Sequence, residues 1–391
     1  WLARHQTTEG AWIQLRTDHA DPARTAPKGG DLARTGLAVL CFLCGDHAPN
    51  KAGPYQRNVK RGVEWLIKRT DRLGRLAKGL TTGRRRWHYN YEHAIATLAM
   101  SEALSRWKDP TLRAAVERAV SYILADQTQY GWRYGFGTSD TDTSVTSWMV
   151  LALRSAEHAG IEVPSATFNK VRLWLTIVSG KDGTTSYVKD GRRTPAMNAS
   201  GLFMRIMLGE SPATTLNKRA TGLVSRSQIR IEGGGIENLY HIYYAALAMY
   251  QVGGEPWKTF NPRIRDGLIG TQHHGSGCQR GSWKGGGYIA DRVLATCFAT
   301  LTLETYYRYL PVHKGPDVEE EIATLSEGER LLDIAGASMN HARASKALGE
   351  VLAARVAYQR ALRALKKESA SWEQLEIAHL ALVELGQLGT D

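Results

Sequence analysis

The amino-acid sequence predicts an all-α fold in which two sets of helices form a closed double ring. Three observations support this prediction: a short phrase repeats along the chain, buried and amphipathic helical segments alternate, and no stretch alternates like a strand. Each repeat is too small to bury its own apolar face. Several repeats must therefore pack around one shared core.

The repeated phrase is an apolar-aromatic pair, three or four further residues, often a Gln, and then a Gly-rich turn with an aromatic residue. It reads WLARHQTTEGAW from Trp1 and YILADQTQYGWRY from Tyr122, and a longer-looped copy runs from Gly267 to Trp283. Weaker copies that lack the Gln begin at Trp65, at Trp174 and, in degenerate form, near Leu223. These copies predict six repeats.

Between the phrases lie six helical segments that are apolar nearly all round, which is typical of helices buried on most sides. We expect them to form six inner helices that begin near residues 32, 91, 142, 196, 238 and 291, with their N-termini at one end of the ring. The segments that lead into the phrases, such as residues 112–124, are more amphipathic. They are expected to form the outer ring.

The charge pattern divides the chain into a basic body and an acidic tail. Residues 1–316 carry a net charge of +17 and residues 317–391 a net charge of −5. A Pro- and Gly-containing stretch with an acidic run, residues 311–321, marks the break. We therefore predict a ring domain over residues 1–315 and a helical C-terminal appendage over residues 316–391. One segment of the appendage has the small-residue spacing of a tetratricopeptide repeat, but a plain helical packing appendage explains it better.

Composition excludes several classes of protein. The basic residues are scattered apart from Arg84–Arg86, so nucleic acid is not expected as a partner. The four cysteines form no disulfide framework, and no metal or cofactor is predicted. No run of 18 apolar residues exists to span a membrane. The sequence gives neither localisation nor oligomeric state; since it opens inside a repeat without a Met, an upstream signal or anchor could have been lost.

The repeated phrases resemble the Gln-Trp motifs of squalene-hopene and oxidosqualene cyclases and of the wider prenyltransferase/squalene-oxidase repeat group, over about residues 1–310. The resemblance implies an α/α toroid with six inner helices, six outer helices and a cavity at one end. It also implies that the motif residues tie neighbouring outer helices together and are structural rather than catalytic. These residues are Gln6, Trp12, Gln127, Trp132, Gln272 and Trp283.

The strongest catalytic candidate is the segment Asp140-Thr141-Asp142-Thr143-Ser144-Val145, which resembles the Asp-x-Asp-Asp-Thr-Ala motif of class II terpene cyclases. Asp142 matches the acid that protonates an alkene or epoxide, and Asp140 matches the first Asp. Thr143 replaces the last Asp, a departure from the motif. The alternative is that Asp142 is a helix N-cap, and one side chain can fill both roles.

Aromatic residues would line the cavity of such an enzyme, because electron-rich rings stabilise carbocations. The candidates for substrate binding are Trp148, Tyr187, Asn238, Tyr240, His241, Tyr243, Tyr244 and Tyr288. The alternative is that a Tyr-rich helix simply belongs to the core, with its hydroxyls hydrogen-bonded inside.

Other functions of ring-shaped helical folds fit the sequence less well. A zinc prenyltransferase would need a Cys ligand near Met197–Ser200 to accompany His241, and a thioester protein needs Gly-Cys-Gly-Glu-Gln where this chain has Gly277–Arg280. A glycosidase needs two carboxylates, and Asp140 and Asp142 lie too close in sequence to supply both sides of a sugar.

The sequence-based prediction is thus a class II terpene cyclase-like protein that cyclises or binds an isoprenoid or another apolar small molecule in the toroid cavity. If it is an enzyme, it is an isomerase or lyase that acts on a polyprenyl substrate. A membrane surface is a further partner that the sequence allows, through peripheral contact. A non-catalytic binding or scaffold module is the alternative.

Overall fold

The computed structural model describes residues 1–14, 30–76, 89–232, 235–236, 238–287 and 289–305. The chain divides into two compact units, Trp1–Val312 and His313–Asp391. The predicted appendage, the Arg84–Arg86 cluster and Tyr288 lie outside the described residues. None of the helices described here is long and apolar enough to cross a membrane.

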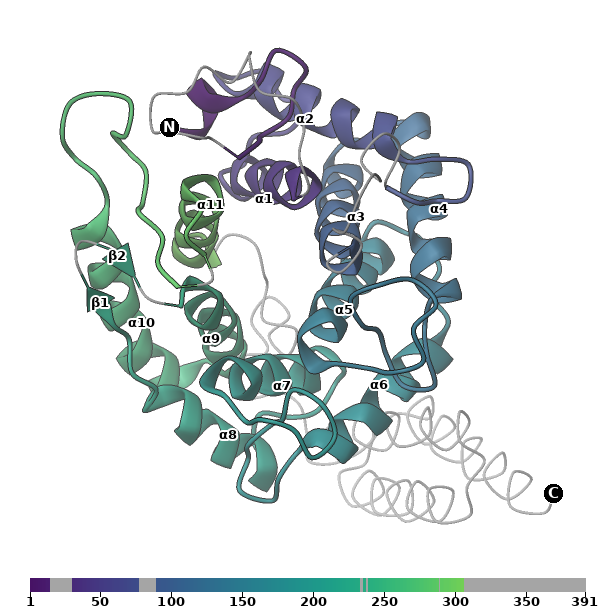
Figure 1. Ribbon diagram of the computed structural model, residues 1–391, viewed down its shortest axis with the longest axis vertical. Coiled ribbons are helices and arrows are strands. Elements are labelled where there is room, and N and C mark those ends of the chain that lie inside the picture. Colours follow the sequence, from purple (N-terminus) through teal and green to yellow (C-terminus); the bar gives the residue numbers. More distant parts are fainter. Residues whose placement is uncertain (15–29, 77–88, 233–234, 237, 288, 306–391) are drawn as a thin grey trace, which may run out of the picture. The chain divides into compact units, whose positions relative to one another are not determined.

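Six described helices form the predicted inner ring of the first unit (Figure 1). Each packs against the next along the chain, and the last packs against the first, so the ring is closed. The helices are α1 (Asp31–Cys44), α3 (Tyr89–Arg106), α5 (Thr143–His158), α7 (Pro195–Met207), α9 (Leu239–Val252) and α11 (Arg292–Leu303). Their starts agree with the predicted positions within a few residues, and the predicted α/α toroid is confirmed.

Five described outer helices surround this ring, and each packs against two neighbouring inner helices. They are α2 (Gln56–Arg69), α4 (Pro110–Ala125), α6 (Ser165–Val178), α8 (Thr215–Ser225) and α10 (Gly254–Thr271). A short 3₁₀ helix, η1 (Leu2–His5), precedes α1. Helix α4 illustrates the pattern, because it buries Leu112, Val116 and Ile123 while Glu117 is exposed.

Inner helices are buried on nearly all sides, which explains their apolar composition. In α5, every residue from Thr143 to Leu153 is buried. Close approach between inner helices requires small residues: a Cβ added to Gly36 of α1 would lie 3.0 Å from the backbone oxygen of Ile95 in α3. The apolar sequence of these segments therefore reflects their place between two neighbours and the outer ring.

One described element was not predicted. Strands β1 (Ile231–Glu232) and β2 (Gly235–Ile236) form an antiparallel hairpin just before α9, with Ile231 opposite Ile236. The strands are only two residues long, too short to produce a visible alternation in the sequence.

The three strong repeat phrases make the same contacts. Each motif Trp donates its backbone N–H to a Thr hydroxyl of the following inner helix: Trp12 to Thr35, Trp132 to Thr146 and Trp283 to Thr296, at 3.0–3.2 Å. Gln6 donates to the carbonyl of Asn58 in α2 and Gln127 to that of Thr167 in α6, both at 2.9 Å. These two glutamines therefore have the structural role that the sequence predicted.

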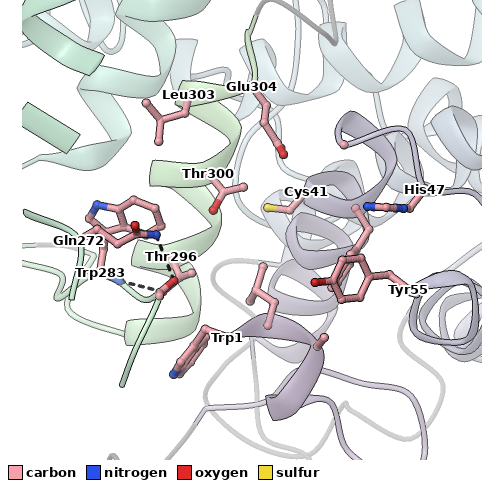
Figure 2. A pocket seen from close by; sticks show the side chains of 15 residues that line it. Trp1, Cys41, His47, Tyr55, Gln272, Trp283, Thr296, Thr300, Leu303 and Glu304 are labelled. Carbon is pink, nitrogen blue, oxygen red and sulfur yellow. Dashed lines mark hydrogen bonds between the residues drawn. The ribbon is translucent and has the colours of Figure 1, made fainter. Parts of the chain in front are cut away.

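We call the boundary between α11 and α1, where the first and last inner helices meet, the α11–α1 seam. Figure 2 shows the pocket of about 350 Å³ that lies there, with residues of α11 on one side and residues of α1 on the other. Trp1 and Leu2 line it near η1, and Gln272 and Trp283 line it from the loop that precedes α11.

Candidate functional site

The first turns of the inner helices gather on one side of the ring, which we call the N-terminal face. Side chains connect these turns to one another: Arg34 of α1 contacts Asp291 before α11, and Ser144 of α5 contacts Tyr240 of α9, with 2.5 Å between their oxygens. Before α7, the loop carbonyl of Tyr187 accepts from the backbone N–H of Thr143 at 2.9 Å. The predicted common orientation of the inner helices is thus confirmed.

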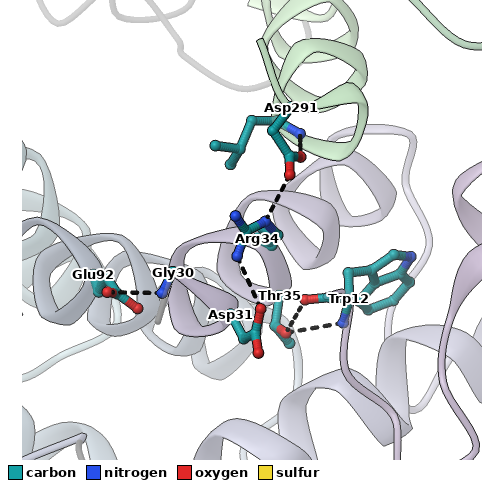
Figure 3. Close-up of polar contacts among 8 residues, drawn as sticks. Trp12, Gly30, Asp31, Arg34, Thr35, Glu92 and Asp291 are labelled. Atoms are coloured by element: carbon teal, nitrogen blue, oxygen red, sulfur yellow. Dashed lines mark hydrogen bonds and ion pairs between the residues drawn. The ribbon is translucent and has the colours of Figure 1, made fainter. Parts of the chain in front are cut away.

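Charged groups close the ring on this face (Figure 3). The guanidinium of Arg34 pairs with Asp31 at 2.9 Å and with Asp291 at 3.2 Å. The carboxylate of Glu92, in the first turn of α3, accepts from the backbone N–H of Gly30 at 3.0 Å. Burial raises the pKa of Glu92 to about 7, so this acid is partly protonated near neutral pH.

Asp142 is the N-cap of α5. Its Oδ1 accepts from the backbone N–H of Val145 at 2.8 Å, while its Oδ2 is buried without a hydrogen-bond partner. The hydroxyl of Tyr187 lies nearby. Burial raises the pKa of Asp142 to about 7, although the Val145 N–H and the charge of Arg133 act against this change. Asp142 therefore caps the helix as proposed and also holds a proton readily at neutral pH.

Asp140 lies in a different environment two residues earlier. It is exposed, and its carboxylate pairs with the guanidinium of Arg133 at 2.7 Å. Arg133 also acts electrostatically on Asp142, so both carboxylates lie within the field of one cation. The segment thus presents a buried acid beside an exposed ion pair.

Half-buried tyrosines surround this pair of carboxylates. The hydroxyls of Tyr187 and Tyr134 are hydrogen-bonded to each other, and the rings of Tyr91 and Tyr134 lie 5.6 Å apart. Tyr240 is connected to the same region through Ser144. Burial raises the pKa of Tyr187 and Tyr240, so both phenols stay protonated and can donate hydrogen bonds.

Three of the predicted binding residues belong to the core. Trp148, Tyr243 and Tyr244 are at most 1% exposed, and the Trp148 and Tyr243 rings stack with centroids 5.6 Å apart. The hydroxyl of Tyr244 accepts from Ser147 at 2.9 Å. The alternative interpretation, a Tyr-rich helix packed inside the ring, describes these three residues better than a ligand-contacting role.

The remaining candidates divide between surface and interior. Asn238 is exposed and caps α9, where its side-chain oxygen accepts from the backbone N–H of His241 at 3.2 Å. His241 is buried, and burial lowers its pKa to about 4, so its imidazole is neutral at pH 7. Tyr288 lies outside the described residues.

Sequence reasoning missed four side chains of this face: Tyr91, Glu92, Arg133 and Tyr134. Tyr91 and Glu92 occupy the first turn of α3, just as Ser144 and Tyr240 occupy first turns of α5 and α9. The signal that could have found them is position, because the first turns of the inner helices lie at this face. In the described part of the chain, no group of three or more His, Cys, Asp or Glu residues is arranged to hold a metal ion.

No model of a known protein family matches the chain, and no curated protein matches it. Solved structures do match. The alpha-1,6-mannanase GH76A of Salegentibacter sp. HEL1_6 has a TM-score of 0.54 and 11% identity, over 77% of this chain and 94% of that chain. At this identity the likeness shows the fold.

Two inactive variants of the same mannanase also match, each at a TM-score of 0.53 and 10% identity over 78% of this chain. In them two consecutive aspartates are replaced, by asparagine in a complex with alpha-1,6-mannotriose and by alanine in a complex with alpha-1,6-mannotetrose. The matches cover 95% and 94% of those chains.

These findings overturn the sequence-based assignment to the terpene cyclase and prenyltransferase group. The predictions of isoprenoid cyclisation, of an isomerase and of an apolar small-molecule partner were wrong, because the structures that share this fold are glycosidases with sugar ligands. The scaffold alternative gains no support either. The Gln-Trp phrases misled because they join helices at the outside of the ring, a role that does not depend on chemistry at its end.

Proposed function

We propose that the protein is a glycoside hydrolase whose active site lies on the N-terminal face. The observation that carries the proposal is the pair of carboxylates before α5: Asp142, buried with a pKa of about 7, and Asp140, exposed and paired with Arg133. Most glycoside hydrolases use two carboxyl groups in different environments, one as the acid and the other as the base or nucleophile.

In this mechanism Asp142 is the general acid. It donates its proton to the glycosidic oxygen while the bond from that oxygen to the anomeric carbon breaks. Asp140 accepts a proton from the water that adds to the anomeric carbon, so the two half-reactions balance. A pKa of about 7 suits this acid, because it keeps a large fraction protonated at neutral pH without making the proton hard to release.

The sequence argument against this assignment was that the two aspartates lie close together. The two groups nevertheless differ in environment, because Asp142 is fully buried whereas Asp140 is exposed and paired with Arg133. The shared neighbour Arg133 is consistent with both groups facing one region.

The tyrosines around this pair offer a surface suited to sugar. Tyr134, Tyr187 and Tyr240 are half-buried, so each combines an apolar ring with a hydroxyl that can hydrogen-bond. Asp142 itself is fully buried, and the Tyr187 hydroxyl lies beside it. Access of a substrate to Asp142 thus requires the Tyr187 side chain to move.

The fold supports the same proposal. The mannanase structures bind alpha-1,6-mannooligosaccharides, and the replacement of two consecutive aspartates accompanies inactivity in those variants. Alpha-1,6-linked mannooligosaccharides are therefore the first substrates to test, followed by other oligosaccharides.

The decisive experiment measures sugar release by the full chain and by Asp142→Asn. Asn caps a helix about as well as Asp, so the variant stays folded with a melting temperature no lower than that of the unmodified chain, while hydrolysis falls by about 10²–10⁴-fold. The matched control is Asp109→Asn, because Asp109 caps outer helix α4 in the same way, accepting from Leu112 N–H at 2.8 Å. Asp109→Asn keeps full activity.

Two results would contradict the proposal. One is the absence of hydrolysis by the unmodified chain across a panel of oligosaccharides. The other is a wild-type rate in the folded Asp142→Asn variant, which would place any activity elsewhere.

A further inference from the structure

The loop that carries Arg133 and Asp140 also presents an aromatic ring to solvent. Phe136 lies between these two residues, and its side chain is 60% exposed, more than any other Phe, Tyr or Trp side chain in the described part of the chain. Removing an apolar ring from water is favourable. Phe136 therefore offers binding free energy to a partner that covers it.

One face of the Phe136 ring is supported by outer helix α4. It stacks on the ring of Tyr122 in the last turn of α4, with centroids 5.0 Å apart and an interplanar angle of 30°. Tyr122 is itself buried and meets the ring of Tyr89 edge-on, with 5.9 Å between the centroids. Since one face is covered in this way, an exposed fraction of 60% requires the opposite face of the Phe136 ring to be open.

Hydrogen bonds to buried groups fix the loop on both sides of Phe136. The backbone N–H of Asn90 donates to the carbonyl of Tyr134 at 3.0 Å, and the backbone N–H of Gly137 donates to Oδ1 of Asp126 at 2.7 Å. The side-chain amide of Asn90 donates to the other oxygen of Asp126, also at 2.7 Å. Gly137 has a φ of +71°, which glycine adopts without strain. The exposed ring is thus held in a defined position.

Phe136 also lies close to the candidate catalytic pair. Because it precedes Asp140 by four residues, their Cα atoms are at most about 14 Å apart. The ion pair between Arg133 and Asp140, at 2.7 Å, joins the two ends of this segment and places Phe136 on the loop between them. A sugar chain bound at Asp140 and Asp142 can therefore extend over Phe136 with its neighbouring units.

We propose that Phe136 is a stacking surface for one of the sugar rings beside the cleaved bond. A pyranose carries C–H groups on its ring faces and hydroxyls around its edge. One face can therefore pack on an aromatic ring while the hydroxyls stay in water. This inference rests on the proposed function, because it takes an oligosaccharide as the ligand, but it assigns Phe136 to binding and not to the chemical step. Phe136 thus makes the protein prefer longer oligosaccharides.

Binding without turnover can be measured in the Asp142→Asn variant of the full chain by isothermal titration calorimetry. The test sugar is alpha-1,6-mannotetrose or, if it does not bind, the oligosaccharide of the panel that binds most tightly. Adding Phe136→Leu to this variant should raise the Kd by about 2- to 10-fold, the size expected for the loss of one aromatic contact. Leucine keeps an apolar side chain against Tyr122 but has no flat ring. Adding Phe136→Tyr instead should leave the Kd within about 2-fold, because tyrosine keeps the ring.

The matched control is Leu173→Ala in the same background. Leu173 is 58% exposed, nearly as much as Phe136, but it lies on outer helix α6, so its removal should leave the Kd unchanged. In the otherwise unmodified chain, Phe136→Leu should raise the KM for the test sugar and leave kcat unchanged. This result is expected for a contact that is equally strong before and in the transition state.

The role of Phe136 and the proposed hydrolase activity fail in different ways. If the Asp142→Asn variant binds the sugar and Phe136→Leu does not weaken that binding, the role of Phe136 is overturned while the hydrolase proposal stands. The same holds if Phe136→Tyr weakens binding as much as Phe136→Leu. If binding depends on Phe136 but the unmodified chain hydrolyses no oligosaccharide, the stacking surface is supported and the hydrolase proposal fails. Absence of binding to every oligosaccharide of the panel overturns the inference.

Discussion

Two aspartates of the N-terminal face begin inner helices in the same way and differ in almost everything else. Asp142 accepts from Val145 N–H at 2.8 Å and Asp291 from Leu294 N–H at 2.9 Å. The second oxygen of Asp291 accepts from the guanidinium of Arg34, whereas that of Asp142 is buried without a hydrogen-bond partner. Burial raises the pKa of Asp142 to about 7. A shared capping role therefore does not make two carboxyl groups equivalent, because the burial of Asp142 opposes its charged form.

Removing the cation beside Asp291 should have the largest effect on stability. Arg34→Met leaves Asp31, which is fully buried, without its guanidinium, and breaking such a buried pair costs about 3–5 kcal/mol. Chemical denaturation measures the change in the free energy of unfolding. Arg113→Met is the control, because its pair with Glu117 is exposed and contributes at most about 0.5 kcal/mol. Equal losses in the free energy of unfolding for the two substitutions would show that burial does not increase the contribution of an ion pair to stability in this protein.

The two capping aspartates should respond differently to the same substitution. Asp291→Asn keeps the cap but removes one charge partner of Arg34, so we expect the free energy of unfolding to fall by about 1–3 kcal/mol. Asp142→Asn keeps the cap and replaces an acid that is already reluctant to ionise, so no loss is expected. If Asp142→Asn proved the more damaging of the two, the comparison between these aspartates would fail.

The raised pKa of Asp142 predicts a pH dependence with a definite sign. In the unfolded chain this carboxyl has its ordinary pKa of 3.8, and in the folded chain a pKa of about 7. Between about pH 4 and pH 7 the folded state keeps a proton that the unfolded state has lost, so Asp142 makes the protein less stable as the pH rises. For one proton the slope reaches at most about 1.4 kcal/mol per pH unit.

Denaturation of the wild type and Asp142→Asn across this range measures that slope. The stability advantage of the variant should grow from pH 4 to pH 7, whereas Asp109→Asn should show no such trend. Glu92, whose pKa is also about 7, keeps its own slope in both proteins. A difference that shrinks with rising pH would contradict the protonation state assigned to Asp142.

The smallest effect should come from removing the tail. Deleting residues 317–391 is expected to leave a cooperatively melting ring, because the charge break and the Pro-Gly stretch suggest few shared contacts. The melting temperature of the truncated protein measures this. Loss of soluble protein, or of the cooperative transition, would show that the tail contributes to the core.

The sequence predicted the ring well because the burial of a helix determines its amino-acid composition. The inner helices touch neighbours on nearly every side, so segments such as that from Thr143 to Leu153 contain few charged residues. The strong Gln-Trp phrases also marked real contacts, since Trp12, Trp132 and Trp283 make equivalent bonds. The short hairpin before α9 gave no pattern to detect.

The site was harder to predict, because a side chain's role depends on how far along the helix it lies from the N-terminal face. Tyr240 reaches the N-terminal face, whereas Tyr243 and Tyr244, one turn further along, are sealed in the core. Their spacing of three and four residues places all three on one side of α9, so helical periodicity alone does not separate them. The pairing of Asp140 with Arg133 also depends on a loop conformation that composition does not reveal.

Closure of the ring has a consequence for how the protein folds. Arg34 and Asp291 are 257 residues apart, whereas Asn90 and Arg133, which join neighbouring inner helices, are 43 apart. Bringing together ends about six times more distant along the chain costs about 1.5 kcal/mol more in loop entropy. The seam should therefore form late, after the neighbouring repeats have assembled in order. The contact between Arg34 and Asp291 should also break early in unfolding. The backbone amides of η1 and α11 are therefore expected to exchange with solvent before those of α5.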